Sequence, residues 1–512
     1  MSCVSIIIGM DSRLEARRRD FKKVVDSADA RRRREGETVQ IRKLEKEEQM
    51  QRRRRISDEF HATENFTIEN LPDLASALLA DEIFAVSRGL RGIRRLLSVQ
   101  NVPPVAQVRA IPGVLNRLCE ILKLDAQPDL QFESSWALTN IASGKSEDTA
   151  AVVELGALPV FLNHLILPDP RVREQAIWAL GNIAGDCADF RDSIVSAGAA
   201  ERICEIIQKS ESEQLTETAV WALSNFCRGK PFCSVDAMLV IIPTLFAILS
   251  EGAVTAKTTA DALWSLSYLC DGPPDRAMKV VRAESEILFR AVHFLQNTNL
   301  SIQSAAMRAV GNLTSGSSEV TKKLVIALPA IRELFRSSKK SIRKEAVWAV
   351  SNFLADSPAM ITAVAEHEFF PILREMAAAG GDSDIKREVA WCYCNAANAA
   401  RADQIRWLWE EGDVLAAISH LLTARDTKTV KTALEAIRVI FTACRVSGQL
   451  AAATLRFELA DGLAKLEDLQ EDESQEIYDA ARFILCEFFE TEEFEDQNFV
   501  ENADKKKASF NF

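Results

Sequence analysis

Histidine is scarce in this sequence, and the residue groupings that most catalytic sites need are missing. The five histidines among 512 residues are dispersed, and no His/Cys or Ser/His/Asp grouping can be assembled around them. The segment SGKS at 143–146 resembles the end of a phosphate-binding loop, but Thr139 stands where that loop needs its first glycine. We therefore predict that the protein is not an enzyme and binds no cofactor.

The eleven cysteines are scattered rather than arranged as metal ligands. Cys227 and Cys233 share the segment CRGKPFC, and Cys392 and Cys394 form CYC. Neither pair has the spacing of a structural zinc site with a second pair. We expect buried, reduced thiols and no bound metal.

Long apolar runs are also missing. The opening segment MSCVSIIIG is too short to span a bilayer and has no basic residues before it. We therefore predict neither a signal peptide nor insertion into a membrane.

The alternation typical of β-strands does not recur, but a longer pattern does. A pair of residues recurs eight times at intervals of 40 to 44 residues, and it is usually tryptophan followed four residues later by asparagine. The eight pairs are Trp136/Asn140, Trp178/Asn182, Trp221/Asn225, Trp264/Tyr268, Arg308/Asn312, Trp348/Asn352, Trp391/Asn395 and the degenerate Glu435/Val439. This period is typical of helical solenoids of the armadillo or HEAT type. Around the pairs, apolar residues follow helical spacing. We predict an all-α, right-handed superhelical armadillo solenoid of about ten repeats.

The first seven of these pairs form what we call the Trp/Asn stripe. Residues four apart lie on one face of a helix, and Ala, Leu and Ile already fill the buried positions. A core aromatic is the simpler interpretation of a single tryptophan, but it does not account for the recurring asparagine. An indole face attracts a cation by roughly 0.5–2 kcal/mol, and an amide can pair with the backbone of an extended peptide. The stripe therefore predicts a groove for basic peptides.

Charge supports this hypothesis. The chain has a net charge of −12, yet the first 60 residues contain 17 Lys/Arg and 12 Asp/Glu. An acidic solenoid suits a basic peptide and disfavours direct binding of nucleic acid. The basic segment itself is poor in apolar residues, and we expect it to be disordered when free. Taken alone, it also fits a nucleic-acid-binding arm or a nuclear localisation patch.

The repeat motifs resemble those of the importin-α (karyopherin-α) family of nuclear import adaptors over about residues 13–490. The segments WALTNIASG, WALGNIAGD, WALSNFCRGKP, WSLSYLCDG, RAVGNLTSG, KEAVWAVSNF and REVAWCYCNA occur in the family's order. The N-terminal arm resembles the importin-β-binding domain. The predicted divisions are an extension at 1–12, the arm at 13–58, a linker at 59–71, the solenoid at 72–490 and an acidic tail at 491–512.

The resemblance implies two cargo grooves and an internal ligand. The major groove comprises Trp136, Asn140, Gly144, Thr149, Trp178, Asn182, Asp186, Trp221 and Asn225. The minor groove comprises Arg308, Asn312, Thr321, Glu345, Trp348, Asn352, Glu388, Trp391 and Asn395. Trp264 and Tyr268 lie between the grooves. The basic clusters Arg31, Arg32, Arg33, Arg34 and Arg52, Arg53, Arg54, Arg55 are the expected autoinhibitory and importin-β-binding residues.

The resemblance also implies partners and location. Expected partners are importin-β, cargo with mono- or bipartite basic nuclear localisation signals, nucleoporins, and a CAS-type export receptor with Ran-GTP. The protein is expected to shuttle between cytoplasm and nucleus. Because about sixteen residues, Ile56 to Leu71, join the last basic cluster to the solenoid, that cluster would reach an effective concentration of order mM at the groove. The alternatives are an armadillo scaffold in adhesion or signalling and a rigid HEAT-type assembly scaffold.

Overall fold

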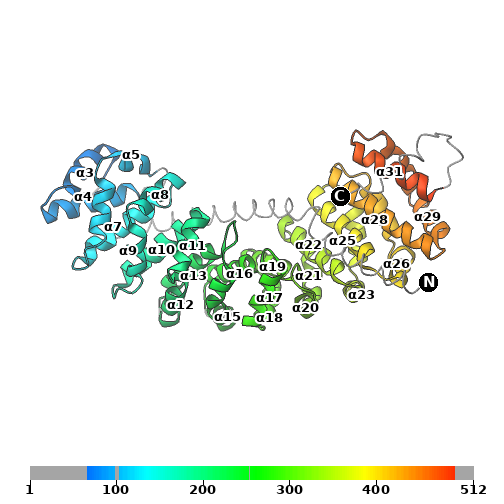
Figure 1. The fold of residues 1–512 in the computed structure, drawn as a ribbon, viewed down its shortest axis with the longest axis horizontal. Coiled ribbons are helices and arrows are strands. Elements are labelled where there is room, and N and C mark those ends of the chain that lie inside the picture. Colours follow the sequence, from blue (N-terminus) through cyan, green and yellow to red (C-terminus); the bar gives the residue numbers. More distant parts are fainter. Residues whose placement is uncertain (1–65, 99–102, 211, 253, 490–512) are drawn as a thin grey trace, which may run out of the picture. The chain divides into compact units, whose positions relative to one another are not determined.

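The computed structural model describes residues 66–98, 103–210, 212–252 and 254–489, and within these ranges it contains α-helices and short 3-10 helices but no strand (Figure 1). The predicted all-α fold is confirmed. The described chain divides into two compact units, the N-terminal unit (66–309) and the C-terminal unit (310–489).

The N-terminal unit consists of one pair of helices followed by groups of three. The pair, preceded by η1 (Ile68–Asn70), is α3 (Leu71–Leu78) and α4 (Ile83–Leu96). The groups are α5 (Val105–Ala110), α6 (Val114–Ile121) and α7 (Pro128–Ile141); α8 (Ser146–Glu154), α9 (Ala157–His164) and α10 (Pro170–Asp186); α11 (Ala188–Ser196), α12 (Ala199–Lys209) and α13 (Glu213–Cys227); α14 (Val235–Met238) with η2 (Leu239–Ile241), α15 (Ile242–Glu251) and α16 (Ala256–Cys270); and α17 (Pro274–Ala283), α18 (Ile287–His293) with η3 (Phe294–Gln296), and α19 (Leu300–Thr314) as far as Ala309.

The C-terminal unit continues the same grouping from Val310. Its groups are α20 (Ser318–Lys323) with η4 (Leu324–Ala327), α21 (Leu328–Leu334) and α22 (Lys340–Asp356); α23 (Pro358–Glu366), α24 (Phe369–Ala378) and α25 (Ser383–Ala399); α26 (Ala402–Glu410), α27 (Val414–Leu421) and α28 (Thr427–Val446); and α29 (Leu450–Glu458), α30 (Gly462–Asp468) with η5 (Leu469–Glu471), and α31 (Gln475–Phe488).

The last helix of each group forms the centre of the stack. In the N-terminal unit α4, α7, α10, α13 and α16 contact one another in that order, and in the C-terminal unit α22, α25, α28 and α31 do the same. Every residue of α10 from Gln175 to Ala184 is buried, because α7, α13, α9 and α11 all pack against this helix. A helix packed against neighbours over most of its surface is apolar nearly all round, and the core of each unit follows these central helices.

Short polar residues set where the central helices begin. The side chains of Ser212, Thr255 and Asp426 accept hydrogen bonds from backbone N–H groups in the first turns of α13, α16 and α28. Such caps satisfy N–H groups that have no partner within the helix and contribute about 1 kcal/mol each. The caps therefore fix where these three central helices begin.

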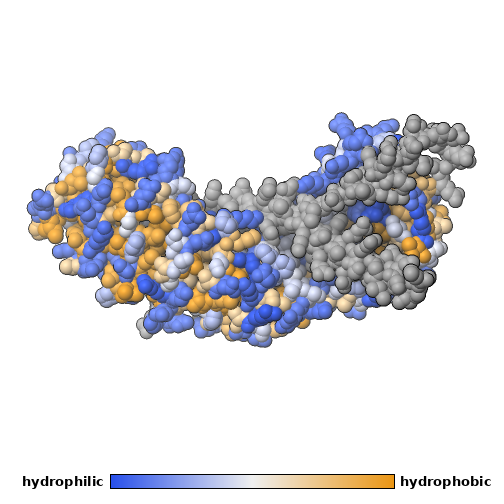
Figure 2. Space-filling view, in the orientation of Figure 1, coloured by the Kyte–Doolittle hydropathy of each residue, from blue (hydrophilic) through white to orange (hydrophobic). Residues whose placement is uncertain are grey.

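The surface of the N-terminal unit mixes polar and apolar side chains. Figure 2 shows apolar residues interspersed with hydrophilic ones over the part of the unit that contains α3 to α13. Across residues 66–489, as far as they are described, none of the helices combines the length and apolarity needed to cross a lipid bilayer.

Candidate peptide-binding site

The Trp/Asn stripe lies on the central helices. Its pairs are carried by α7, α10 and α13 in the N-terminal unit and by α22 and α25 in the C-terminal unit. Trp264 and Tyr268 lie on α16, where their rings stack with centroids 5.9 Å apart. Since residues four apart share a helix face, each helix with a Trp/Asn pair presents the indole and the amide together.

The indoles of the stripe pack closely against the neighbouring repeat. Trp178 and Trp221 are buried, and their ring centroids are 5.2 Å apart. A Cβ atom added to Gly181 would lie only 2.5 Å from Cζ3 of Trp221, and one added to Gly311 would lie 2.3 Å from Cζ3 of Trp348. These two glycines therefore make room for the indole of the next repeat. The core-aromatic interpretation is thus partly right, because these rings pack between repeats, and Trp221 also borders the cavity described below.

The asparagines of the stripe tie consecutive repeats together. In three cases the side-chain amide donates to the carbonyl of the residue just before the preceding stripe asparagine: Asn182 to Thr139 (3.4 Å), Asn352 to Gly311 (3.3 Å) and Asn395 to Ser351 (2.9 Å). This structural role was not predicted from the sequence. The amide of Asn352 also donates to the hydroxyl of Thr314 at 3.4 Å.

The amide oxygen of Asn182 lies unpaired inside the stripe. It is buried and has no hydrogen-bond partner among the described residues, and the whole residue is only 3% exposed. Buried acceptors are paired in most folded proteins, and an unpaired one costs about 1–3 kcal/mol. An N–H donor brought by a ligand would remove this cost.

A cavity of about 320 Å³ opens beside this asparagine, between the ends of α7, α10 and α13. It is lined by Ala142, Gly144, Lys145, Ser146, Gly181, Asn182, Gly185, Asp186, Trp221, Asn225 and Arg228. Five of the nine residues predicted for the major groove line it, namely Gly144, Asn182, Asp186, Trp221 and Asn225. Lys145 and Arg228 were not predicted as site residues, although Lys145 directly follows the motif WALTNIASG and Arg228 lies within WALSNFCRGKP. The single carboxylate in the lining belongs to Asp186.

Asp186 is held by the turn that follows α7. The hydroxyl of Ser146 donates to the carboxylate of Asp186 at 2.7 Å, and the hydroxyl of Thr149 donates to the carbonyl of Ala142 at 3.0 Å. A Cβ atom on Gly144 would lie 2.6 Å from Oδ2 of Asp148, so this turn needs a glycine. The predicted residues Gly144, Thr149 and Asp186 are thus brought together, and Ser146 is an addition from the structure.

The first indole of the stripe already has a cation on its face. The guanidinium carbon of Arg94, on α4, lies 4.5 Å from the ring centroid of Trp136. Arg94 is also paired with Glu133 at 2.7 Å. This contact was not predicted, and it shows a stripe indole accepting a positive charge within the protein itself.

The C-terminal unit contains most of the residues predicted for the minor groove. The hydroxyl of Thr321 donates to the carbonyl of Thr314 at 3.2 Å. Glu345 on α22 and Glu388 on α25 are both buried. Trp348, Asn352, Trp391 and Asn395 lie on the same two helices, and Asn312 lies on the last turn of α19. Arg308, one turn earlier on α19, belongs to the N-terminal unit.

At the degenerate eighth repeat position, Glu435 forms an ion pair with a residue of its own helix. Glu435 on α28 accepts two hydrogen bonds from Arg438, at 2.6 and 2.7 Å. The hydrogen bonds that Arg438 donates to the Glu435 carboxylate raise the pKa of Arg438. The chain therefore provides its own cation at this position, and α28 offers no Trp/Asn pair.

Comparison with known proteins identifies the family. The importin beta binding domain family matches residues 17–82, the armadillo/beta-catenin-like repeat family matches 145–185 and 187–228, and the atypical Arm repeat family matches 453–502. Importin subunit alpha-3 of Arabidopsis thaliana is 34% identical over 96% of this chain and 95% of its own length. Importin subunit alpha-1a of Oryza sativa subsp. japonica is 34% identical over 98% of this chain and 97% of its own. This chain belongs to the importin-α family.

The fold of this importin-α family member also matches a solved structure. An engineered protein aligns over 81% of this chain and 98% of its own length with a TM-score of 0.71 and 24% identity. The armadillo fold expected from the 40 to 44 residue period is therefore confirmed. The basic clusters Arg31–Arg34 and Arg52–Arg55 lie outside the described residues.

The cysteines of this importin-α chain are mostly buried in the packing between helices. The ten cysteines within the described ranges form no disulfide. Burial raises the pKa of Cys119 to about 11 and that of Cys270 to about 12, so both thiols stay protonated at neutral pH. Among the same residues, no group of three or more His, Cys, Asp or Glu side chains could hold a metal ion.

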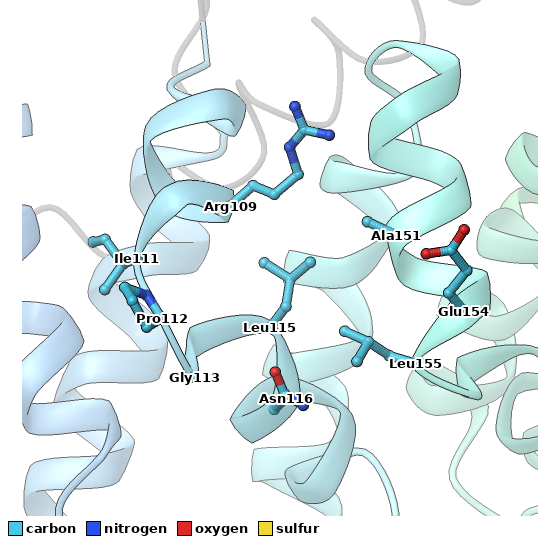
Figure 3. Close-up of a pocket in the computed structure, with 9 residues that line it drawn as sticks. All are labelled: Arg109, Ile111, Pro112, Gly113, Leu115, Asn116, Ala151, Glu154 and Leu155. Atoms are coloured by element: carbon cyan, nitrogen blue, oxygen red, sulfur yellow. The ribbon is translucent and has the colours of Figure 1, made fainter.

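A second cavity, of about 300 Å³, lies away from the stripe residues between the α5–α6 turn and α8 (Figure 3). Leu115 and Leu155 form its apolar wall, and Arg109 borders it. Arg109 is already paired with Glu147 at 3.0 Å and with Asp148 at 3.2 Å. None of the predicted site residues lines this cavity.

Proposed function

We propose that this importin-α family member is a nuclear import adaptor that binds basic nuclear localisation signals along the Trp/Asn stripe. The observation that carries the proposal is the cavity in which the Asp186 carboxylate lies beside the unpartnered oxygen of Asn182 and the indole of Trp221. A carboxylate, an amide acceptor and an aromatic face are the groups that a lysine in an extended peptide requires.

The peptide's lysine would enter the cavity beside Asp186. Its ammonium has three donors, which the Asp186 carboxylate, the Thr149 hydroxyl and the backbone carbonyls at the end of α7 can accept. A cation is also favoured there because helix C-termini carry a partial negative charge. The peptide backbone would pair with the stripe amides, each of which keeps hydrogen-bonding capacity beyond its contact with the preceding repeat.

In this proposal the minor groove takes a second basic cluster. Its residues are Arg308, Asn312, Thr321, Glu345, Trp348, Asn352, Glu388, Trp391 and Asn395. Cargo proteins with one basic cluster would use mainly the major groove, and those with two clusters would use both. The buried carboxylates of Glu345 and Glu388 supply negative charge on the helices that bear Trp348 and Trp391.

The N-terminal basic segment would link cargo to its carrier. The importin beta binding domain family matches residues 17–82, and we assign importin-β as the partner of this segment. In the absence of importin-β, Arg52–Arg55 would occupy the cargo groove in cis. Binding of importin-β would release the groove, so carrier and cargo would bind with reciprocal positive coupling.

The remaining parts of the proposal come from the family alone. The protein would shuttle between cytoplasm and nucleus, contact nucleoporins, and return with a CAS-type export receptor and Ran-GTP. The second candidate function is an armadillo scaffold in adhesion or signalling, which would need neither the unpartnered Asn182 oxygen nor the N-terminal basic clusters.

Titration of a fluorescent Lys-Lys-Lys-Arg-Lys peptide into the full-length chain tests the proposal. We expect weak binding to the chain alone and tighter binding when importin-β is added. Asp186→Asn should weaken the peptide by about 10-fold or more, because hydrogen bonds to charged groups contribute about 1.5–3 kcal/mol. Glu147→Gln is the matched control, since it removes the same charge from the next helix. Absence of binding with and without importin-β would instead favour the scaffold function.

A further inference from the structure

The turn after α19 in the C-terminal unit repeats the turn that borders the Asp186 cavity. Three hydrogen bonds occur at equivalent positions. The hydroxyls of Ser143 and Ser315 donate to the carbonyls of Asn140 and Asn312, both at 2.7 Å. The N–H groups of Gly144 and Gly316 donate to the carbonyls of Ile141 and Leu313, at 3.0 and 3.1 Å. The hydroxyls of Thr149 and Thr321 donate to the carbonyls of Ala142 and Thr314, at 3.0 and 3.2 Å.

A carboxylate completes both arrangements. Ser146 donates to Asp186 at 2.7 Å, and Ser318 donates to Asp356 at 2.9 Å. Asp186 is the last residue of α10, and Asp356 is the last residue of α22. In each case a serine hydroxyl joins the turn of one repeat to the end of the next central helix. Both carboxylates are half-buried, and no ion pair of the described residues involves either of them.

Asp356 stands at a position of the repeat where most other repeats have glycine or alanine. Eight residues after the tryptophan position, the eight repeats have Gly144, Asp186, Gly229, Gly272, Gly316, Asp356, Ala399 and Ala443. Aspartate thus occurs at this position only in the second and sixth of the eight motifs, and each aspartate follows a motif that ends in glycine. The pairing of glycine and aspartate in consecutive repeats occurs twice, once in each groove.

We propose that Asp356 adds a carboxylate to the minor groove, where it forms a lysine-binding pocket together with Thr321 and the turn at Gly316. The inference rests on the proposed function, because it assigns to this groove the same ligand class, an extended peptide with a lysine. The ammonium would be accepted by the Asp356 carboxylate, the Thr321 hydroxyl and a backbone carbonyl at the end of α19. A compact ammonium with three donors fits these three acceptors better than a planar guanidinium does.

The specific consequence is that the minor groove selects lysine at this position and has an affinity of its own. The stripe supplies indole and amide contacts that lysine and arginine share. A carboxylate at the end of α22 adds a charged acceptor that a glycine or alanine at the same position would lack. The protein would therefore hold two lysine-centred clusters, rather than one strong cluster and one weaker extension.

Asp356→Asn separates this role from a structural one. The asparagine keeps an oxygen that can accept the Ser318 hydroxyl, so the contact between the two repeats is preserved. It loses only the negative charge that an ammonium would require. Glu319→Gln is the matched control, because Glu319 is exposed on α20 next to Ser318 and pairs only with Lys323, at 3.9 Å, among the ion pairs of the described residues.

The experiment is calorimetric titration of the Lys-Lys-Lys-Arg-Lys peptide into the full-length chain with Arg52–Arg55 replaced by alanine, so that these arginines do not compete. We expect two peptides per chain. Asp356→Asn should weaken one site by about 10-fold or more and leave the other unchanged, and Asp186→Asn should do the converse. Glu319→Gln should change neither site. Thermal melting of each variant checks that the fold is intact.

A double-mutant cycle identifies the lysine concerned. Each peptide lysine is replaced in turn by norleucine, which has a similar shape and no charge. One of these norleucine replacements should weaken binding at the minor groove of the unaltered protein but should have no such effect in the Asp356→Asn variant. Two bound peptides with no effect of Asp356→Asn would overturn this inference and leave the proposed function standing. No bound peptide in any chain would overturn both.

Discussion

Replacing Gly181 by alanine tests whether the Trp/Asn stripe depends on close packing between repeats. The new Cβ would lie 2.5 Å from Cζ3 of Trp221 and 3.1 Å from two further ring atoms. The indole is only 4% exposed and cannot swing into solvent without disturbing the stack. Overpacking of this kind costs about 1–3 kcal/mol. Helix propensity opposes it, because alanine is favoured over glycine by about 1 kcal/mol in a helix interior.

Gly185→Ala is the matched control because it lies on the same helix, α10. There the added Cβ would meet nothing closer than Cγ of Asn225 at 3.6 Å, which is ordinary contact. The propensity gain applies in the same direction to both variants, although it is smaller near the helix end. The free energy of unfolding should therefore be lower for Gly181→Ala than for Gly185→Ala by about 1–3 kcal/mol.

Guanidinium chloride unfolding followed by circular dichroism measures this difference. The transition midpoints of the two variants can be compared if their slopes agree, which also checks that the mutations do not alter cooperativity. Gly181→Ala should in addition weaken binding of a basic peptide, because Trp221 borders the cavity. A midpoint for Gly181→Ala equal to or above that of Gly185→Ala would refute the packing argument.

Three further predictions concern pH, thiol reactivity and the first repeat. Burial lowers the pKa of His164 below its usual 6.5, so the unfolded chain binds a proton that the folded chain does not. The free energy of unfolding should therefore fall as the pH is lowered through about 6.5, the unfolded-state pKa, and urea titrations should show a smaller fall for His164→Asn. Iodoacetamide at neutral pH should modify the exposed Cys486 in the native protein, and Cys270 only after denaturation, as read by mass spectrometry. Arg94→Gln removes a buried cation from Glu133 and Trp136; it should lower the free energy of unfolding by about 3 kcal/mol, and an unchanged melting curve would contradict the contact.

The architecture could be predicted because repetition makes a weak local signal strong. A single tryptophan such as Trp178 is compatible with any core, but tryptophan at a spacing of 40 to 44 residues requires a repeated structural unit. The placement of Gly144, Thr149 and Asp186 in one site came from the family resemblance, and the structure brings these three residues together through the turn after α7.

Contacts between repeats could not be predicted from the motif. From the sequence, the stripe asparagines were expected to pair with a peptide, whereas Asn395 donates to the carbonyl of Ser351, 44 residues earlier. Gly181 had no predicted role, because its small size matters only where Trp221 of the next repeat lies over it. Arg94 had none either, since GIRRLL offers no local reason for one arginine to lie on the ring of Trp136.

The amino-acid sequence by itself determined the helical repeat, its period and the columns of residues on the central helices, because these depend on spacing along one chain. Tertiary structure alone decided which atoms of neighbouring repeats meet. The pairing of Ser318 with Asp356 joins residues 38 positions apart, and no local pattern encodes a hydrogen bond that forms only when two central helices stack. The chemistry of each groove therefore depends on contacts between neighbouring repeats. The packing of the helices, and the lack of a side chain at glycines such as Gly181, set the distances between the contacting atoms.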